Sequence, residues 1–435
     1  MDDSFRDADA RHIWHPFTQE EGAPPPIPIR SGQGTRLFGE DGRIYLDLIG
    51  SWWVNIHGHA HPHIAAAIAR QAQTLEQVIF AGFTHRPAVH LAQELTRILP
   101  PGLDQFFFSD NGSTAVEVAL KMALQHAVNR GENRRRFVVF EGSYHGDTVG
   151  AMSVGRSSGF FTAFEPLLFE VDTLPFPATW NDDPEVETKE RLALQALDHY
   201  LQRHGKTCAG WLVEPLVQGA GGMRLCRPSF LREAALRVRA QGIPLLFDEV
   251  MTGFGRTGSH FACQQTGITP DLICLSKGLT GGFLPLGLTV CTPEIRQAFR
   301  GDRFDRAFAH GHSFTANPIS CAAAVASLEI LHREKSLEKV AAIQAIHRER
   351  LAALAGHPRI SRPRSIGVIA ALDLDSDRAD YHSPLGPALK AFFLEEGLLI
   401  RPLGNVVYLL PPFCITPDEL HRGWDGIEKA LRHVV

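Results

Sequence analysis

The stretch Pro244–Gly278 begins PLLFDEVMTGFGRTG and ends DLICLSKG. It contains two short apolar runs, Leu245–Phe247 and Leu272–Leu275, which are too short for helices and are flanked by Pro and Gly. Such runs are typical of fully buried parallel strands. The first run is followed by Asp248, and the second ends close to Lys277. Because ligands of open α/β sheets bind beyond the carboxyl ends of the strands, we expect Asp248 and Lys277 to meet at one binding site.

A carboxylate and an amine at that edge suit one cofactor in particular. Pyridoxal phosphate is attached through a lysine and needs an aspartate against its pyridine nitrogen. Taken singly, the two residues have ordinary explanations, because a lysine after a strand is usually solvated and an aspartate there often caps the next helix. Together, with a glycine-rich loop between them and a phosphate-type turn upstream, they favour the cofactor site and make Lys277 and Asp248 candidate catalytic residues.

The pattern of the rest of the chain predicts an α/β protein. Strands alternate with helical patterns over roughly residues 80–325, which favours a mostly parallel, doubly wound sheet. The two chain ends are expected to form a smaller α+β domain. We expect an N-terminal arm and part of the small domain at 1–75, a large cofactor-binding domain at 76–330, and the C-terminal part of the small domain at 331–435.

The N-terminal residues are expected to be extended or to form short strands. The proline cluster Pro24–Pro28 is incompatible with a packed helix, so residues 1–30 should form an arm that lies on other structure. The following segment, which includes GSWWVNIHGHAHP, predicts two or three short strands. In a strand, Trp52 and Trp53 would face opposite sides, one lining a pocket and one in the core.

Composition places the chain among ordinary globular proteins. It has 435 residues, of which 44% are hydrophobic and 21% charged. The net charge of −5 gives no electrostatic case for binding nucleic acid or an anionic membrane. No apolar run reaches transmembrane length, and the N-terminus is too polar for a secretory signal. The seven cysteines are scattered singly, which predicts buried free thiols in a reducing, cytoplasmic compartment.

A phosphate-type turn is predicted within the sequence FSDNGSTAVE at residues 108–117. A strand meets a helix there through small residues, and Thr114 and Glu117 have the spacing of a capping box. Free backbone N–H groups at Gly112 and Ser113, with the helix dipole, would bind a phosphate. A plain helix cap is the alternative. The turn is neither a Walker nor a Rossmann loop, because GxxxxGK and GxGxxG are both absent.

Three further residues are candidates, and each also has an ordinary structural explanation. Tyr144, in GSYHGD, could stack on a flat cofactor ring or pack as an ordinary turn residue. Ser313, in FAHGHSFTANP, could donate to a phosphate or cap a helix. Arg401, in LLIRPL, could clamp a substrate carboxylate or form a surface salt bridge.

Four histidines alternate along the chain at His57, His59, His61 and His63. Alternation sends neighbouring side chains to opposite faces of an extended chain. No cysteine or carboxylate set completes a metal site. We therefore expect no metal site there.

These motifs resemble one enzyme family. Pro244–Gly278, NGSTAVE, GSYHGD, VEPLVQGAGG and HGHSFTANP are together similar to class III, fold type I aminotransferases, which use pyridoxal 5'-phosphate, and the match is collinear over nearly the whole chain. HIWHPFTQ, GSWWVNIHGHAHP and IRPLGNVVYLLPP resemble more narrowly the members that act on 8-amino-7-oxononanoate in biotin biosynthesis.

The resemblance implies a role for each matching residue. Lys277 would carry the cofactor, Asp248 would contact its pyridine nitrogen, and Tyr144 would line its ring. Gly112 and Ser113 would hold the cofactor phosphate. A loop with Gly311, His312 and Ser313 would reach the phosphate across a homodimer interface. Substrate would be contacted by Phe17, Trp52, Trp53, Arg256, Gly311 and Arg401.

The implied reaction is the ping-pong conversion of 8-amino-7-oxononanoate to 7,8-diaminononanoate with S-adenosylmethionine as amino donor. Lysine is a second possible donor, because Phe17 stands where some members have a substrate-contacting Tyr and the HGHS and GGFLPLG segments look closer to lysine-dependent members. The motifs also leave open an ω-amino-acid or ornithine-type transaminase, a decarboxylase or mutase on the same cofactor, and a non-enzymatic binding module.

Overall fold

The computed structural model describes residues 3–156, 161–376, 381 and 383–434. Within these residues, a seven-stranded central sheet has the order β4-β12-β11-β10-β7-β5-β6. Its strands are β4 (Gln105–Ser109), β5 (Arg136–Phe140), β6 (Asp172–Leu174), β7 (Cys208–Val213), β10 (Leu245–Asp248), β11 (Leu272–Leu275) and β12 (Gly287–Cys291). β12 runs antiparallel to both neighbours, and the other neighbouring strands run parallel. The mostly parallel sheet predicted from the sequence is confirmed.

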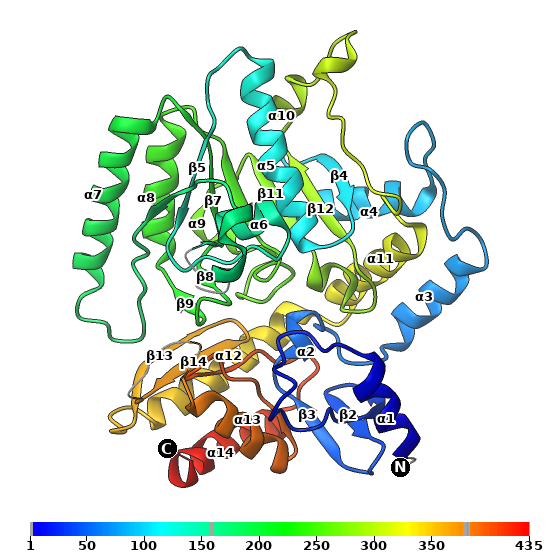
Figure 1. Ribbon diagram of the computed structural model, residues 1–435, viewed down its shortest axis with the longest axis vertical. Coiled ribbons are helices and arrows are strands. Elements are labelled where there is room, and N and C mark those ends of the chain that lie inside the picture. The colour runs from blue at the N-terminus through cyan, green and yellow to red at the C-terminus, as the bar shows by residue number, and fades with distance from the viewer. Residues whose placement is uncertain (1–2, 157–160, 377–380, 382, 435) are drawn as a thin grey trace.

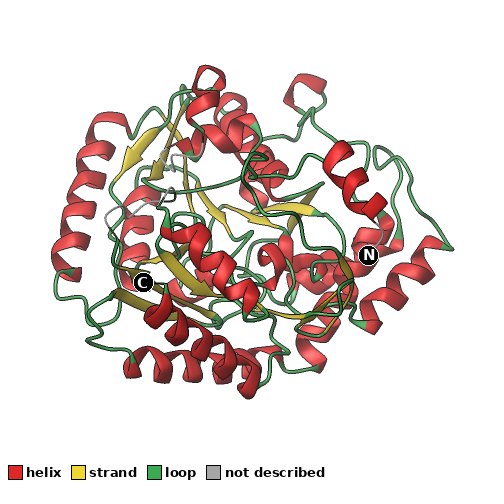
Figure 2. Cartoon of the chain, turned by 60° about the horizontal axis from the view of Figure 1, so that its bottom comes forward, coloured by secondary structure: helices red, strands yellow, loops and turns green. Residues whose placement is uncertain are grey.

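Helices cover both faces of this sheet (Figure 2). Alternate side chains of β5 enter different cores: Phe137 and Val139 on one face, Val138 and Phe140 on the other. The first face is packed by α5 (Gly112–Asn129), α6 (Val149–Val154) and α10 (Pro293–Gln297). The second is packed by α4 (Arg86–Thr96), α7 (Val186–His204), α8 (Pro228–Arg239), α9 (Ala262–Thr266) and α11 (Pro318–Arg333). Burial of both faces explains the continuous apolar runs of β10 and β11.

A smaller α+β domain lies below the central sheet and contains both chain ends (Figure 1). One sheet has the order β1-β2-β3-β15 and the other β13-β14-β16. Their strands are β1 (Ile29–Gln33), β2 (Arg36–Gly39), β3 (Ile44–Asp47), β13 (Ile360–Ile366), β14 (Ile369–Leu374), β15 (Leu398–Leu399) and β16 (Val406–Leu409). The parallel pairing of β3 with β15 joins the N-terminal strands to the C-terminal part. The domain boundaries at 75/76 and 330/331 stay a prediction.

The remaining elements complete both parts. They are α3 (Pro62–Ala72), α12 (Ser336–Ala353), α13 (Leu385–Glu395), α14 (Pro417–His433) and the hairpin of β8 (Val217–Gln218) with β9 (Arg224–Leu225). Helix α14 begins with a Thr416–Glu419 capping box, which fixes its first turn. None of the described helices is long and apolar enough to cross a membrane.

One N-terminal prediction is wrong and a second is confirmed only in part. A helix, α1 (Asp3–His12), precedes the proline cluster, so the first residues are not wholly extended. The prolines stop a helix only from their own positions onward, and α1 ends well before them. Two of the short strands predicted in the following segment are present, β2 and β3, but Gly50–Trp53 form a short turn, α2, and not a strand.

Candidate active site

A cavity of about 570 Å³ lies beyond the carboxyl ends of β10 and β11, where the small domain meets the central sheet. It brings together most of the predicted site residues: Phe17, Trp52, Trp53, Gly112, Ser113, Tyr144, Asp248, Lys277 and Arg401. Four predicted residues, Arg256, Gly311, His312 and Ser313, do not line it.

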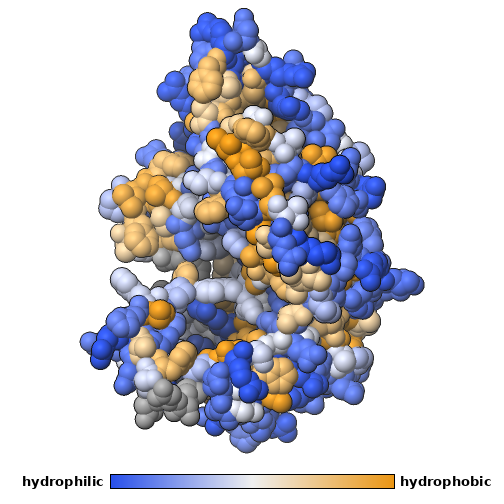
Figure 3. All heavy atoms as spheres, turned by 90° about the vertical axis from the view of Figure 1, so that its right-hand side faces the viewer, coloured by the Kyte–Doolittle hydropathy of each residue, from blue (hydrophilic) through white to orange (hydrophobic). Residues whose placement is uncertain are grey.

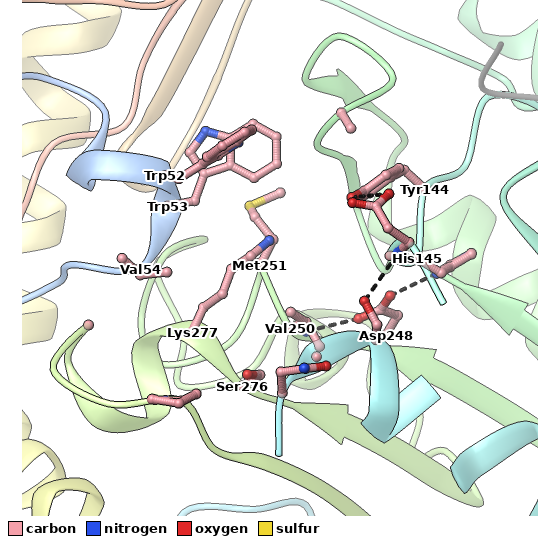
Figure 4. Close-up of a pocket in the computed structure, with 18 of the residues that line it drawn as sticks. Trp52, Trp53, Val54, Tyr144, His145, Asp248, Val250, Met251, Ser276 and Lys277 are labelled. Atoms are coloured by element: carbon pink, nitrogen blue, oxygen red, sulfur yellow. Dashed lines mark hydrogen bonds and ion pairs between the residues drawn. The ribbon is translucent and has the colours of Figure 1, made fainter. Parts of the chain in front are cut away.

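Asp248, the last residue of β10, is buried and held from two sides. Its Oδ2 atom lies 2.7 Å from Nδ1 of His145, and its Oδ1 atom accepts the N–H of Val250 at 3.0 Å (Figure 4). A carboxylate only accepts hydrogen bonds, so Nδ1 of His145 carries the proton. Within the described residues, the buried Nε2 atom of His145 has no hydrogen-bond partner. His145 therefore fixes the orientation of Asp248 through a single contact.

Lys277 begins the turn that follows β11. Its φ of 45° is in the left-handed region, which is uncommon for residues other than glycine. The amine points across the cavity toward Trp53, and Nζ lies 4.9 Å from the centroid of that ring (Figure 4). Burial lowers the pKa of Lys277 to about 8, although the negative charge of Asp248 opposes the shift. A neutral, nucleophilic amine is thus accessible close to neutral pH.

Glu214 lines the cavity beside these two residues and was not singled out from the sequence. Its two oxygens accept the N–H groups of Tyr144 and Gly219, each at 3.0 Å. Burial raises the pKa of Glu214 to about 7, and Asp248 acts in the same direction while His145 opposes it. Glu214 directly follows β7, so the strand-end argument that identified Asp248 also applied to it.

The phosphate-type turn is present, with a capping box in a different register. Helix α5 begins at Gly112 after the N-cap Asn111. Asn111 Oδ1 accepts the N–H of Thr114 at 3.0 Å, and Thr114 Oγ1 accepts the N–H of Asn111 at 2.9 Å. The predicted Thr114–Glu117 box is wrong because the helix starts one turn earlier. Glu117 instead accepts the N–H of Gly150 at 2.6 Å.

This start of α5 leaves an anion site at the cavity wall. The N–H groups of Gly112 and Ser113 lie in the first helical turn, where no helical carbonyl can accept them. A Cβ atom on Gly146, whose φ is 122°, would collide with Ser113 Oγ, so only glycine allows this close approach. Ser113 Oγ also accepts the N–H of Asp147 at 3.2 Å. The turn is therefore tied to the 144–147 loop.

Tyr144 lines the same cavity. Its hydroxyl donates to Asp147 Oδ1 at 3.0 Å, and its ring stacks on Phe161 with centroids 6.0 Å apart. Burial, assisted by the charge of Asp147, raises the pKa of Tyr144 well above its usual range. Tyr144 therefore stays a neutral hydrogen-bonding group with an apolar face.

Trp52 and Trp53 both line the cavity, on the turn α2, with exposed fractions of 42% and 4%. The two residues do not lie in a strand, because Asp47 folds the chain into a turn. Trp53 nevertheless belongs to the hydrophobic core and Trp52 lines the pocket, as predicted. The buried carboxylate of Asp47 accepts the N–H groups of Ile49 at 3.1 Å and Ser51 at 2.7 Å. It also lies 2.9 Å from His59 Nε2. Trp53 has a left-handed φ of 62°, and its own backbone is held at both ends: its N–H donates to the Ile49 carbonyl at 3.2 Å, and its carbonyl accepts from Arg256.

Aromatic and cationic groups meet at the outer wall. The guanidinium of Arg401 lies 4.5 Å from the Trp52 ring centroid, and Phe17 contacts the same ring edge-on at 5.5 Å. Trp53 Nε1 donates to the Tyr408 hydroxyl at 2.9 Å. This wall can hold an apolar chain that ends in a carboxylate.

Arg256 lies behind this wall and not in it. It is 1% exposed and donates through Nη2 to the carbonyl of Trp53. Burial lowers the pKa of Arg256 to about 9. Its observed contact supports the tryptophan turn.

The loop with Gly311, His312 and Ser313 lies outside the cavity of its own chain. His312 Nδ1 lies 3.3 Å from Asp110 Oδ2, and the Ser313 carbonyl accepts from Gln77 Nε2 at 3.0 Å. These contacts attach the loop to the start of α5 and to the segment before α4.

The four alternating histidines have separate partners. His57 contacts Ser327 at 2.9 Å, His59 contacts Asp47, His61 contacts Glu334 at 3.1 Å, and His63 contacts Glu329. In the part of the chain that the structure describes, no group of three or more His, Cys, Asp or Glu could hold a metal ion.

The residues of the cavity fit pyridoxal phosphate. An anion site at Gly112 and Ser113, a fixed carboxylate at Asp248 and an amine at Lys277 all line one cavity. The close approach of Gly146 to Ser113 keeps side-chain bulk out of the phosphate end. This donor set supplies what the cofactor's phosphate, pyridine nitrogen and aldehyde require.

Comparison with known proteins agrees with this geometry. The family model described as aminotransferase class-III matches residues 17–431. The chain is 56% identical over 423 residues to a protein of Synechococcus elongatus named adenosylmethionine-8-amino-7-oxononanoate aminotransferase, covering 97% of this chain and 99% of that one. It is 40% identical to a protein of the same name from Geobacter sulfurreducens, covering 99% and 98%.

Solved structures give the same result. A crystal structure of adenosylmethionine-8-amino-7-oxononanoate aminotransferase from Methanocaldococcus jannaschii matches with a TM-score of 0.92 and 32% identity, covering 100% of both chains. An (S)-enantioselective omega-transaminase from Thermomicrobium roseum matches with a TM-score of 0.94 and 29% identity, covering 100% of this chain and 99% of that one. The chain belongs to the class III aminotransferase family.

Proposed function

We propose that this enzyme is a pyridoxal-phosphate-dependent transaminase that converts 8-amino-7-oxononanoate to 7,8-diaminononanoate in biotin biosynthesis, with S-adenosylmethionine as amino donor. One cavity supports this proposal most strongly, because it holds Lys277, Asp248 and the anion site of α5 beside an aromatic wall with Arg401. The names of relatives that match along nearly the whole chain support the choice of acceptor.

Each of these residues has a separate role in the proposed reaction. Bound pyridoxal phosphate supplies the electron sink that stabilises a carbanion. Asp248, held by His145, would place its carboxylate against the pyridine nitrogen. Lys277 would bind the cofactor covalently. Its amine, once free, would take the proton from the amine-bearing carbon of the donor in the first half-reaction and deliver a proton to the carbonyl carbon of the acceptor in the second. Gly112 and Ser113 would bind the phosphate, and Tyr144 would line the ring.

Arg401 and the aromatic wall are the proposed substrate contacts. Arg401 would bind the carboxylate of the oxononanoate through two parallel hydrogen bonds. Trp52, Trp53 and Phe17 would pack along the alkyl chain, and the face of Trp52 would also attract a sulfonium donor by cation–π contact. Because donor and acceptor use the same site in turn, the kinetics should be ping-pong. Arg256 would position substrate through the Trp53 carbonyl.

We also propose a homodimer in which the loop with Gly311, His312 and Ser313 reaches the cofactor phosphate of the partner. Large apolar side chains are exposed near this loop, at Ile79, Phe83 and Phe314. Figure 3 shows this side of the molecule, where apolar side chains gather among charged ones. A second copy would cover such a surface. Six buried free cysteines, with Cys414 partly buried, fit the proposed cytoplasmic location.

A single-turnover experiment tests the proposed donor. Protein loaded with cofactor is mixed separately with S-adenosylmethionine, lysine or an ω-amino acid, and the visible absorption of the bound cofactor is followed. Loss of the band with S-adenosylmethionine supports the proposal. Loss with lysine alone would establish lysine as the donor. Loss with ω-amino acids alone would contradict the assignment to biotin biosynthesis.

A further inference from the structure

The Lys277 turn is supported from behind by a buried pair of side chains that do not touch the cavity. Helix α11 passes under the turn and presents Ser327, which is fully buried. Ser327 Oγ donates to the carbonyl of Gly278 at 3.2 Å. The same oxygen lies 2.9 Å from Nε2 of His57. A chain of two hydrogen bonds therefore runs from His57 to the residue next to Lys277.

The direction of this chain follows from its atoms. A carbonyl only accepts, so the single hydroxyl proton of Ser327 is used on Gly278. The oxygen of Ser327 must then accept from His57, whose Nε2 atom carries the ring proton. Burial lowers the pKa of His57 to about 3, so the ring stays neutral at physiological pH. The His57 N–H occupies a lone pair of Ser327 and directs the hydroxyl toward Gly278.

The turn needs such support. Lys277 has a left-handed φ of 45°, and a side-chain-bearing residue keeps this conformation only where its surroundings hold it. Inside the turn, Leu279 N–H bonds to the Ser276 carbonyl and Gly281 N–H to the Gly278 carbonyl, both at 3.0 Å. Ser327 adds a second hydrogen bond to the Gly278 carbonyl, the acceptor that closes the second half of the turn.

The packing around the turn is tight at the same place. A Cβ atom on Gly281, whose φ is 64°, would lie 3.0 Å from Cδ2 of His57 and 3.5 Å from Ser327 Oγ. A side chain at Gly281 would therefore crowd His57, so glycine allows this close packing of the turn. Neither residue lines the cavity, and both are joined to it through the Lys277 turn.

We propose that Ser327 and His57 are positioning residues that lock the Lys277 turn and so fix the amine for proton transfer. The proposal rests on the proposed transaminase function. Loss of the Ser327 hydroxyl should loosen the turn, leave the cofactor pocket intact, and slow the step that Lys277 carries out.

The test compares Ser327→Ala with Ser320→Ala, a serine-to-alanine control on the same helix. Hydrogen exchange at residues 277–283, followed by mass spectrometry with and without cofactor, reports the turn directly. Ser327→Ala should speed exchange there about tenfold, as expected for the loss of one hydrogen bond, with α11 unchanged. The donor half-reaction should slow by a similar factor, with unchanged cofactor affinity and donor KM.

Two rescue variants keep the proposal falsifiable. Ser327→Thr retains the hydroxyl and should restore exchange and rate, and His57→Gln retains an N–H donor and should lose less than His57→Ala. The proposal is overturned if Ser327→Ala matches Ser320→Ala, or if it lowers only the melting temperature. If wild type shows no transamination, the proposed function fails, while the exchange measurement still decides whether Ser327 holds the turn.

Discussion

Nδ1 of His145 lies 2.7 Å from Oδ2 of Asp248, and both side chains are buried. Replacing His145 by Ala removes the group that holds the carboxylate, so we expect kcat to fall about tenfold to a hundredfold with little change in KM. Asp248→Asn removes the charge itself and should cost more than His145→Ala. Steady-state kinetics measure both, with His126→Ala, a buried histidine on α5, as control. An unchanged kcat for His145→Ala would contradict the role assigned to this contact.

The second prediction concerns the pKa of Lys277. In cofactor-free protein, chemical labelling of Lys277 should rise with pH around 8, against about 10.4 for an ordinary lysine. The negative charge of Asp248 raises this pKa, so Asp248→Asn should move the inflection to lower pH. Quantitative mass spectrometry of the labelled peptide measures both, and Lys277→Ala removes the signal. An inflection near 10 in wild type would show that the amine is not desolvated.

The third prediction is a pH dependence of stability from Glu214. The pKa of Glu214 is raised from 4.5 to about 7, so the folded state binds more protons than the unfolded state between these values. The contribution of Glu214 to the free energy of unfolding is therefore fully present below pH 4.5 and is lost as the pH rises through 7. Denaturant unfolding at several pH values should show this decline, and Glu214→Gln should flatten it. Identical slopes in the two proteins would exclude the shift.

The fourth prediction concerns the tryptophan turn. Asp47→Ala removes the acceptor of two backbone N–H groups and leaves His59 without its carboxylate, so it should destabilise the protein by about 2–4 kcal/mol. The control Asp41→Ala, in an exposed turn, should change stability by no more than about 0.5 kcal/mol. Thermal unfolding and tryptophan fluorescence measure both. Equal effects would contradict the anchoring role of Asp47.

The fifth prediction concerns recognition of the acceptor. Arg401→Ala should raise KM for 8-amino-7-oxononanoate about tenfold to a hundredfold, because a charge-assisted hydrogen-bond pair is lost. Arg401→Lys keeps the charge without the planar fork and should lie between wild type and Arg401→Ala. Half-reaction kinetics with each substrate separate the effects on acceptor and donor. An unchanged acceptor KM would place the carboxylate elsewhere.

The sequence predicts the neighbouring strands β10 and β11 of the central sheet well because their signals are local. The run of β11 is apolar at every position and is followed by a polar turn, so its bounds match the prediction, Leu272–Leu275. The meeting of Asp248 and Lys277 follows from β10 and β11 lying side by side as parallel strands. The carboxyl ends of neighbouring parallel strands always lie at the same edge of a sheet. Once the strands are recognised in the sequence, the edge where a site can form is therefore known as well.

Features that depend on particular long-range contacts are not predictable in this way. Asp47 binds the N–H groups of Ile49 and Ser51 and contacts His59, and these contacts form the turn at Trp52. The local sequence, which is rich in Trp, Val and Ile, favours a strand. The register of the α5 cap depends on where β4 ends, since both Asn111 and Thr114 are good caps. The burial of Arg256 behind Trp53 has no local signal at all.

The most direct test of the proposed function is full turnover by the purified, cofactor-loaded protein. It is incubated with 8-amino-7-oxononanoate and S-adenosylmethionine, and in parallel with lysine, and the products are identified by mass spectrometry. We predict 7,8-diaminononanoate with S-adenosylmethionine, and none when Lys277 is replaced by Ala. Absence of the diamine with both donors, from protein that shows the bound cofactor's visible absorption, would contradict the assignment.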